Sequence, residues 1–136
     1  MAALKRGEFT PLFEEMRSSM VEHNGIGLAA NQIGKDVRAF VIDATVAREN
    51  KVPDVFINPE ITEYSDDTDS TEEGCLSIPG YYSQIPRSKK IWIKAYDEHG
   101  GRVKFRARGL LARILQHETD HLNGIVITDR EKRTKN

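Results

Sequence analysis

The feature that most constrains the fold is a helical pattern at residues 109–123, with the sequence GLLARILQHETDHLN. Apolar residues recur there at the spacing of one helix face, so the segment predicts an amphipathic helix. Within it, His117 and His121 project from the same face on successive turns, about 40° apart around the axis. Leu110 and Ile114 occupy the same arc. Because the apolar face of such a helix is buried, we expect both histidines to point toward the core.

The pattern H-E-x-x-H in this helix has two interpretations. Buried histidines often bond only to backbone carbonyls, and a single histidine here would favour that reading. Two inward imidazoles with Glu118 beside them instead need a shared partner to offset their burial. This motif on a helix is typical of a divalent metal site, in which the glutamate acts as general base. We therefore predict that His117 and His121 bind a metal ion.

A catalytic metal with two histidine ligands lacks a third protein ligand. The chain follows the metzincin pattern as far as Gly124 and then has Ile127 in place of the third histidine. His23 and His99 lie at a predicted helix end and a predicted hairpin turn, where we expect exposure. Cys75 is the single cysteine of the chain and lies in EGCLS. Because thiolate is a strong metal ligand, Cys75 is the best candidate for the third position.

The remaining elements are one further helix and several strands. An apolar run at helical spacing predicts the first helix at 11–24, and the acidic stretch at 66–73 is typical of a surface loop. Strands are expected at 37–43, at 55–64 with an interruption at Pro59, at 91–98 and 102–108 as a hairpin, and at 125–129. This order predicts an α+β fold class, with a mostly antiparallel β-sheet packed around a central helix that carries H-E-x-x-H.

Composition limits the class of protein. The 136 residues, 38% hydrophobic and 30% charged, suit a single globular domain over 1–136. The formal net charge of −1 argues against a nucleic-acid partner. No apolar run approaches the roughly 20 residues that cross a bilayer, and the first ten residues lack the apolar region of a secretory signal. One cysteine cannot form an internal disulfide, so we expect a cytoplasmic protein without membrane contact.

Three motifs follow one another along the chain: GIGLAANQ (25–32), EGCLS (73–77) and QHETDHLNG (116–124). Together they resemble the motifs of the peptide deformylases, and EGCLSIPG followed by IPR (85–87) is similar to the bacterial-type branch. The resemblance implies a metal-dependent hydrolase that removes the N-terminal formyl group from formyl-methionine of nascent polypeptides and releases formate. From the resemblance we expect this chain to lack most of the N-terminal segment and the long C-terminal helix of bacterial members. A short form of this kind suggests a phage origin and action in the host cytoplasm.

The resemblance also implies catalytic and metal-binding roles. One Fe²⁺ per chain, for which Zn²⁺, Ni²⁺ or Co²⁺ can substitute, would be bound by Cys75, His117 and His121. A metal-bound water or hydroxide would attack the formyl carbonyl, with Glu118 as general base and acid. The developing oxyanion would be stabilised by Gln32 and the backbone N–H of Leu76.

Further residues are expected to contact the substrate, a formyl-methionyl peptide. They are Ile26, Gly27, Glu73, Gly74, Leu110 and Ile114. Arg113 and Tyr82 depart from the residues that many family members carry, and both could change the peptide preference. For Arg113 the simpler expectation is that its side chain extends to solvent. The family also suggests a salt bridge between Asp120 and Arg87, against the alternative of two surface charges. We expect a monomer with transient proximity to the ribosome.

Two other functions fit the same motifs less well. A metallopeptidase would also use H-E-x-x-H, but Ile127 and the short remaining chain leave it without its usual third ligand. A catalytically inactive peptide-binding module would keep the fold, but it has no need of the base Glu118 or of Gln32.

Overall fold

The computed structural model describes residues 6–75 and 78–124, apart from the side chains of 71–72, 74–75 and 78–83. Its larger sheet is antiparallel and five-stranded, with the order β1-β2-β3-β6-β7. The strands are β1 (Gly27–Ala29), β2 (Ala39–Ile42), β3 (Val55–Tyr64), β6 (Lys90–Tyr96) and β7 (Arg102–Arg108). β1 and β7 therefore form the two edges of this sheet.

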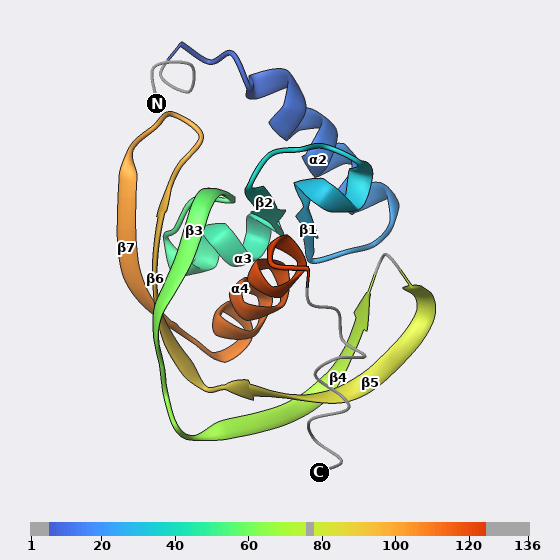
Figure 1. The fold of residues 1–136 in the computed structure, drawn as a ribbon, viewed down its shortest axis with the longest axis vertical. Helices are drawn as coiled ribbons and strands as arrows, with labels where there is room; N and C mark the ends of the chain where they lie inside the picture. The colour runs from blue at the N-terminus through green and yellow to red at the C-terminus, as the bar shows by residue number, and fades with distance from the viewer. Residues whose placement is uncertain (1–5, 76–77, 125–136) are drawn as a thin grey trace.

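A second sheet consists of β4 (Thr68–Cys75) and β5 (Ile78–Ser88), which pair antiparallel. Figure 1 shows this hairpin continuing from the lower ends of β3 and β6 and passing below α4. The acidic stretch expected to be a loop is therefore mostly strand. Its polar side chains lack the alternation that marks a half-buried strand, but the pairing uses backbone groups, which every residue in it supplies.

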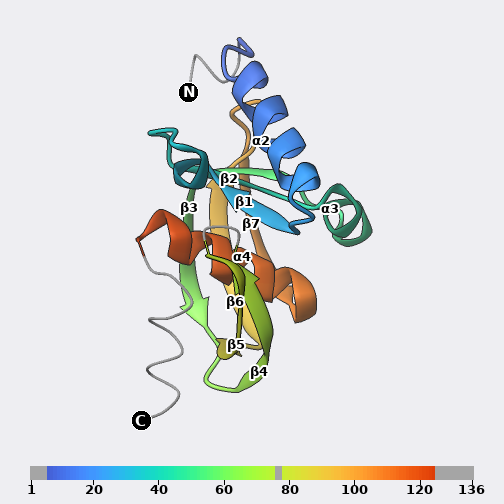
Figure 2. The same cartoon turned by 90° about the vertical axis from the view of Figure 1, so that its right-hand side faces the viewer.

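Helix α4 (Gly109–Leu122) lies at the centre of the fold, enclosed by the curved large sheet and the β4–β5 hairpin (Figures 1 and 2). Its buried apolar residues, among them Ile114 and Leu115, share one hydrophobic cluster with Phe40, Phe56 and Ile93 of the sheet. Each large apolar side chain buried in this way contributes about 1.5–3 kcal/mol. The predicted α+β class with a central motif helix is confirmed.

Strands β1 and β2 are covered on both faces. Helix α2 (Thr10–Glu22) packs Phe13, Met16 and Met20 against one face in a second hydrophobic cluster, while α4 contacts both strands from the other side (Figure 2). All residues of β1 and β2 are buried. The short 3₁₀ helix η1 (Ala30–Ile33) follows β1 directly. This packing positions the GIGLAANQ segment against the motif helix.

The structure differs from the sequence-based expectations in smaller ways. Helix α3 (Ala44–Asn50) was not expected; the side chain of Asp43 caps it by accepting from Thr45 N at 2.8 Å and Val46 N at 3.3 Å. β3 runs through Pro59, with only a shift of its register against β6 there. The strand predicted at 125–129 lies outside the described residues. None of the described helices is long and apolar enough to cross a membrane.

Candidate active site

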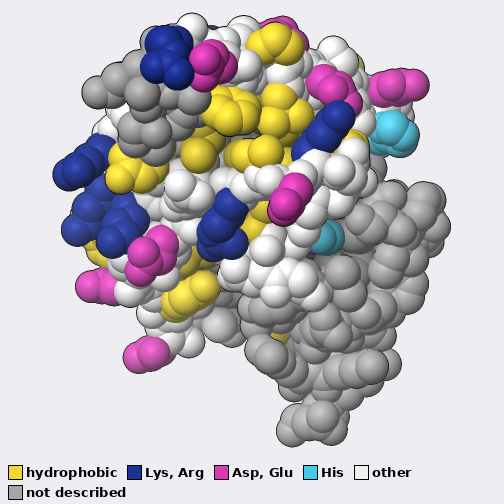
Figure 3. All heavy atoms as spheres, turned by 45° about the horizontal axis from the view of Figure 1, so that its top comes forward, with side chains coloured by type: hydrophobic (Ala, Val, Ile, Leu, Met, Phe, Trp, Pro, Cys, Tyr) yellow, Lys and Arg dark blue, Asp and Glu magenta, His cyan; other side chains and the backbone are white. Residues whose placement is uncertain are grey.

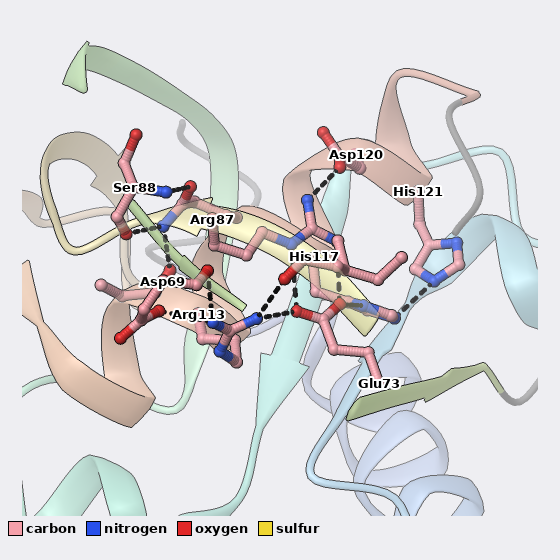
Figure 4. A network of polar contacts seen from close by, with 11 residues as sticks. Asp69, Glu73, Arg87, Ser88, Arg113, His117, Asp120 and His121 are labelled. Carbon is pink, nitrogen blue, oxygen red and sulfur yellow. Dashed lines mark hydrogen bonds and ion pairs between the residues drawn. The ribbon is translucent and has the colours of Figure 1, made fainter. Parts of the chain in front are cut away.

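Two histidines of α4 meet at their ring nitrogens. The Nε2 atoms of His117 and His121, one helical turn apart, lie 2.9 Å from each other (Figure 4). The rings pack edge to face with their centroids 4.6 Å apart, and His121 is only 5% exposed. The predicted inward orientation of both imidazoles is confirmed.

Glu73 of β4 sets the tautomer of the first histidine. Its Oε1 accepts a hydrogen bond from His117 Nδ1 at 2.7 Å (Figure 4). A ring nitrogen bonded to a carboxylate carries the hydrogen, so the other nitrogen, Nε2, presents a lone pair when the ring is neutral. Histidines that bind metal ions are typically oriented by a carboxylate or carbonyl in this way. The hydrogen bond therefore directs Nε2 of His117 toward Nε2 of His121.

The carboxyl group of Glu73 is itself held ionised. Burial raises its pKa, but hydrogen bonds from His117 and Arg87, with the positive charge of Arg87, outweigh burial and lower the pKa to about 2. Arg87 donates from Nε and Nη2 to the two Glu73 oxygens at 3.1 and 2.9 Å, and from Nη1 to Asp120 Oδ2 at 2.5 Å. The predicted Arg87–Asp120 pair is confirmed. Both residues are buried and are not surface charges.

Arg113 is a second guanidinium on the same carboxylate. Its Nη1 donates to Glu73 Oε2 at 2.5 Å and to the carbonyl oxygen of Ile85 at 3.1 Å, and its Nη2 donates to Asp69 Oδ1 at 2.6 Å (Figure 4). The Arg113 side chain is 13% exposed. The expectation that it extends to solvent is wrong, because two carboxylates of β4 hold it against the hairpin.

Glu118 faces the edge strand β1. A Cβ atom added to Gly27 would lie 2.6 Å from Glu118 Oε2 and 2.8 Å from its Cγ. Both distances are too short for a real Cβ, so no residue with a side chain fits at position 27 unless Glu118 moves. The carboxylate of Glu118 is thus packed directly against the β1 backbone, and the residue is 4% exposed. Ile26, immediately before this strand, is 50% exposed. The structure brings together the base candidate and the glycine predicted to lie along the substrate.

The ANQ part of GIGLAANQ is tied to both β1 and α4. Gln32 Oε1 accepts from the backbone N–H of Ala29 at 2.9 Å, which identifies the opposite amide atom, Nε2, as the donor end of this side chain. Asn31 Nδ2 donates to the backbone oxygen of His121 at 2.8 Å. Asn31 was not among the predicted site residues; the one signal for it in the sequence is its place between two motif residues, Ala30 and Gln32.

Two of the described residues, His117 and His121, have the chemistry of metal ligands. Two imidazole nitrogens converge, one of them oriented by a carboxylate, and nitrogen ligands of this kind suit divalent transition metals. Among the described side chains, no group of three or more His, Cys, Asp or Glu is arranged to hold a metal ion. His23 and His99 are exposed, as expected, and do not join the pair. The Cys75 side chain lies outside the described part, so its predicted role is untested.

Other predicted residues have mixed placements. Leu76 lies outside the described residues, and Gly74 is described only through its backbone, which pairs with Tyr82. Leu110 lies about two turns before His117 and is 54% exposed. Ile114 is buried in the main hydrophobic cluster. Their expected contacts with the substrate stay predictions.

A further connection between α4 and the β4–β5 hairpin was not predicted from the sequence. The buried Gln116 side chain accepts from Ser88 N at 3.0 Å and donates to Ser88 O at 2.8 Å. This paired hydrogen bond satisfies the backbone of the last residue of β5. Together with Arg87 and Arg113, it fixes the hairpin against the helix that carries both histidines.

Comparison with known proteins gives a consistent result. The family model described as "Polypeptide deformylase" matches residues 2–136. A peptide deformylase of Prochlorococcus marinus is 49% identical over 119 residues, which are 88% of this chain. This chain spans 59% of the length of that relative.

Two solved structures resemble this one closely. The crystal structure of peptide deformylase from Thermotoga maritima superposes with a TM-score of 0.82 at 41% identity, covering 90% of this chain and 80% of the other. The crystal structure of a probable peptide deformylase from Synechococcus phage S-SSM7 has a TM-score of 0.82 at 35% identity, covering 90% of this chain and 83% of the other.

Proposed function

Because this chain belongs to the polypeptide deformylase family, we propose that it removes the formyl group from the N-terminal formyl-methionine of nascent polypeptides and releases formate. The observation that carries the proposal is the position of Glu118 beside His117 and directly against Gly27 of β1. Glu118 thus lies at the sheet edge and directly follows His117, whose Nε2 converges with that of His121. Such a site suits the hydrolysis of a small amide at the end of an extended peptide.

The free edge of β1 is the proposed peptide-binding element. β1 is the terminal strand of the large sheet, and in the described chain only β2 pairs with it. An extended peptide can add to such an edge through main-chain hydrogen bonds. Gly27 has no side chain, so the Glu118 carboxylate can lie directly against the strand along which the peptide would bind. The exposed Ile26 would contact the same peptide.

A divalent metal ion fits the two converging imidazoles. We assign His117 and His121 as two of its ligands and Cys75 as the third, with Fe²⁺ as the metal and Zn²⁺, Ni²⁺ or Co²⁺ as substitutes. When bound, such an ion polarises the formyl carbonyl and lowers the pKa of a coordinated water. Glu73 would hold the His117 ring in the tautomer that this role requires.

The chain itself would supply the proton transfer and the stabilisation of charge. Glu118 would accept a proton from the attacking water and donate it to the leaving amine of methionine. Gln32, whose Oε1 is engaged by Ala29 N, would donate from Nε2 to the developing oxyanion, together with the backbone N–H of Leu76. Formyl is the smallest acyl group, so a narrow site between β1 and α4 would favour it over larger acyl groups.

Formate release from a formyl-methionyl tripeptide tests the proposal. We expect the protein, purified without oxygen in its Fe²⁺ form or loaded with Ni²⁺, to release formate without cleaving internal peptide bonds. Glu118→Gln should lower kcat by about 10²–10⁴-fold. Glu49→Gln, an exposed glutamate on α3, is the matched control and should leave the rate unchanged.

Two outcomes would contradict the proposal. Cleavage of internal bonds would indicate a metallopeptidase, and binding of the peptide without either activity would indicate a binding module. Full activity of Glu118→Gln would exclude Glu118 as the base.

For the cellular setting, we propose a monomer that acts in the cytoplasm close to ribosomes, where formylated nascent chains are produced.

A further inference from the structure

The outer side of the β6–β7 hairpin is a basic face. Along both strands every second side chain is exposed, and six of these are cations: Lys90, Lys94, Arg102, Lys104, Arg106 and Arg108. The antiparallel register sets Lys90 opposite Arg108 and Lys94 opposite Lys104. We call these six residues and Trp92 the basic face.

Most of these cations form no ion pair with a described residue, although the register also sets the exposed Glu60 and Glu63 of β3 opposite Lys94 and Trp92. Within the described chain, Lys94 is the one member with an ion pair, a 3.4 Å contact with Glu60 in which both side chains are more than half exposed. Like charges directly opposite each other destabilise a pair of strands. Two such pairs on one hairpin therefore lower the stability of the fold. We infer that the cations are present for a function and not for stability.

Protection of the sheet edge accounts for only part of the pattern. β7 is an edge strand, and cations on an edge oppose unwanted pairing with other chains. Lys90 and Lys94, however, belong to β6, which is paired on both sides by β3 and β7. Trp92, also on β6, is 37% exposed in the middle of the face, opposite Arg106. An exposed tryptophan does not serve solubility.

A groove extends the basic face around the edge of the sheet. It has a volume of about 500 Å³ and is lined by residues 50–53, all of β7 and Leu111. Lys51 adds a further cation on its rim. Figure 3 shows Lys and Arg side chains gathered at the left margin of the molecule, the side on which Figure 1 draws β7.

We propose that the basic face binds single-stranded nucleic acid. The cations would contact successive phosphates, since exposed residues recur about 6.4–6.8 Å apart along each strand. Trp92 would stack against a base, and an aromatic ring among cations is the typical arrangement of surfaces that bind single strands. This proposal replaces the expectation drawn from net charge, because a net charge of −1 does not describe a charge distribution so uneven.

Binding at this face leaves the proposed peptide site open. β1 and β7 are opposite edges of the sheet, and the inner sides of β6 and β7 are covered by the core around α4. The basic face therefore points away from His117 and Glu118. Deformylation and nucleic-acid binding can occur on one molecule at the same time.

Tryptophan fluorescence provides a direct measurement, because Trp92 is the only tryptophan in the chain. We expect a 20-nucleotide single-stranded RNA of mixed sequence to quench it. Affinity should fall on the order of 10²-fold between 50 and 200 mM salt, as expected for about five phosphate contacts. The triple variant Lys104→Gln/Arg106→Gln/Arg108→Gln should lose at least ~10-fold in affinity. The charge-matched control Arg6→Gln/Lys35→Gln/Arg48→Gln should change it less than ~3-fold.

Further arms identify the ligand and separate this proposal from the proposed function. A single-stranded DNA of the same sequence that binds equally well would indicate phosphate and base contacts alone, and weaker DNA binding would add contacts to the 2′-hydroxyl. Formate release from the formyl-methionyl tripeptide should be equal in the triple variant, the control and the unchanged protein. It reports the deformylase proposal independently.

Several results would overturn the proposal. The first is that neither RNA nor DNA quenches the fluorescence, and the second is that both triple variants lose affinity equally. The third is that duplex RNA binds as tightly as the single strand. The fourth is that polyglutamate or phosphatidylserine vesicles bind more tightly than the oligonucleotide. Trp92→Ala, followed by anisotropy of a labelled RNA, should lower affinity by about 5- to 100-fold. Unchanged affinity would exclude stacking.

Discussion

Glu73 accepts a 2.7 Å hydrogen bond from Nδ1 of His117 across 44 residues of sequence. The same carboxylate also accepts from Arg87 and Arg113, so a hairpin strand and a helix are joined at one side chain. This arrangement turns Nε2 of His117 toward Nε2 of His121. The structural link between β4 and α4 is therefore also the link that orients the proposed metal site.

Glu73→Gln should weaken metal binding by about 10- to 100-fold, the usual effect of removing a carboxylate that orients a histidine ligand. The amide keeps the size of the side chain but can present its NH₂ to His117 and cannot neutralise two arginines. Competition with a chelator measures the Ni²⁺ affinity. Glu63→Gln, an exposed glutamate on β3, is the control. Equal affinity in all three proteins would exclude this role of Glu73.

Gly27→Ala should remove most of the activity, because its Cβ would lie 2.6 Å from Glu118 Oε2 and displace that carboxylate. We expect kcat for formate release to fall at least ~10-fold. Gly34→Ala is a contrasting control: its φ is +75° and nothing lies within 4 Å of the added atom. That variant should lose about 1–2 kcal/mol of stability and keep its rate. Normal turnover by Gly27→Ala would show that Glu118 tolerates displacement.

Arg87→Ala should destabilise the protein by about 3–5 kcal/mol, because it leaves the carboxylates of Glu73 and Asp120 buried without this cation. Metal retention should fall with it, since Glu73 loses its support. Denaturant unfolding and metal analysis after dialysis measure the two effects. Arg48→Ala, on the exposed side of α3, should change neither. Loss of stability with full metal retention would separate Arg87 from the metal site.

Cys75→Ser should strongly reduce metal content and formate release while most of the fold is kept, because a hydroxyl is a far weaker ligand than a thiolate. His23→Ala and His99→Ala are the matched controls, since both histidines are exposed. Metal content per chain and circular dichroism are the measurements. If Cys75→Ser kept its metal and a histidine control lost it, the assignment of the third ligand would be wrong.

The sequence by itself determined the motif helix and its surroundings to a useful degree. Helical spacing, the paired histidines and the alternating hairpin of β6 and β7 are local patterns, so 109–123 and 102–108 could be predicted within a residue of α4 and β7. The resemblance of three motifs also indicated which family to expect. These features could be predicted because each depends on residues a few positions apart.

Tertiary structure alone decided how those local elements meet. The hairpin of β4 and β5 could not be predicted from its polar sequence, because it forms through backbone pairing. Its contacts between Glu73 and the two arginines, Arg87 and Arg113, join residues 14 and 40 positions apart. The close approach of Gly27 to Glu118 likewise exists only once β1 lies across α4. Sequence periodicity reports which face of an element is buried, but the partner on that face is chosen by packing of the whole chain.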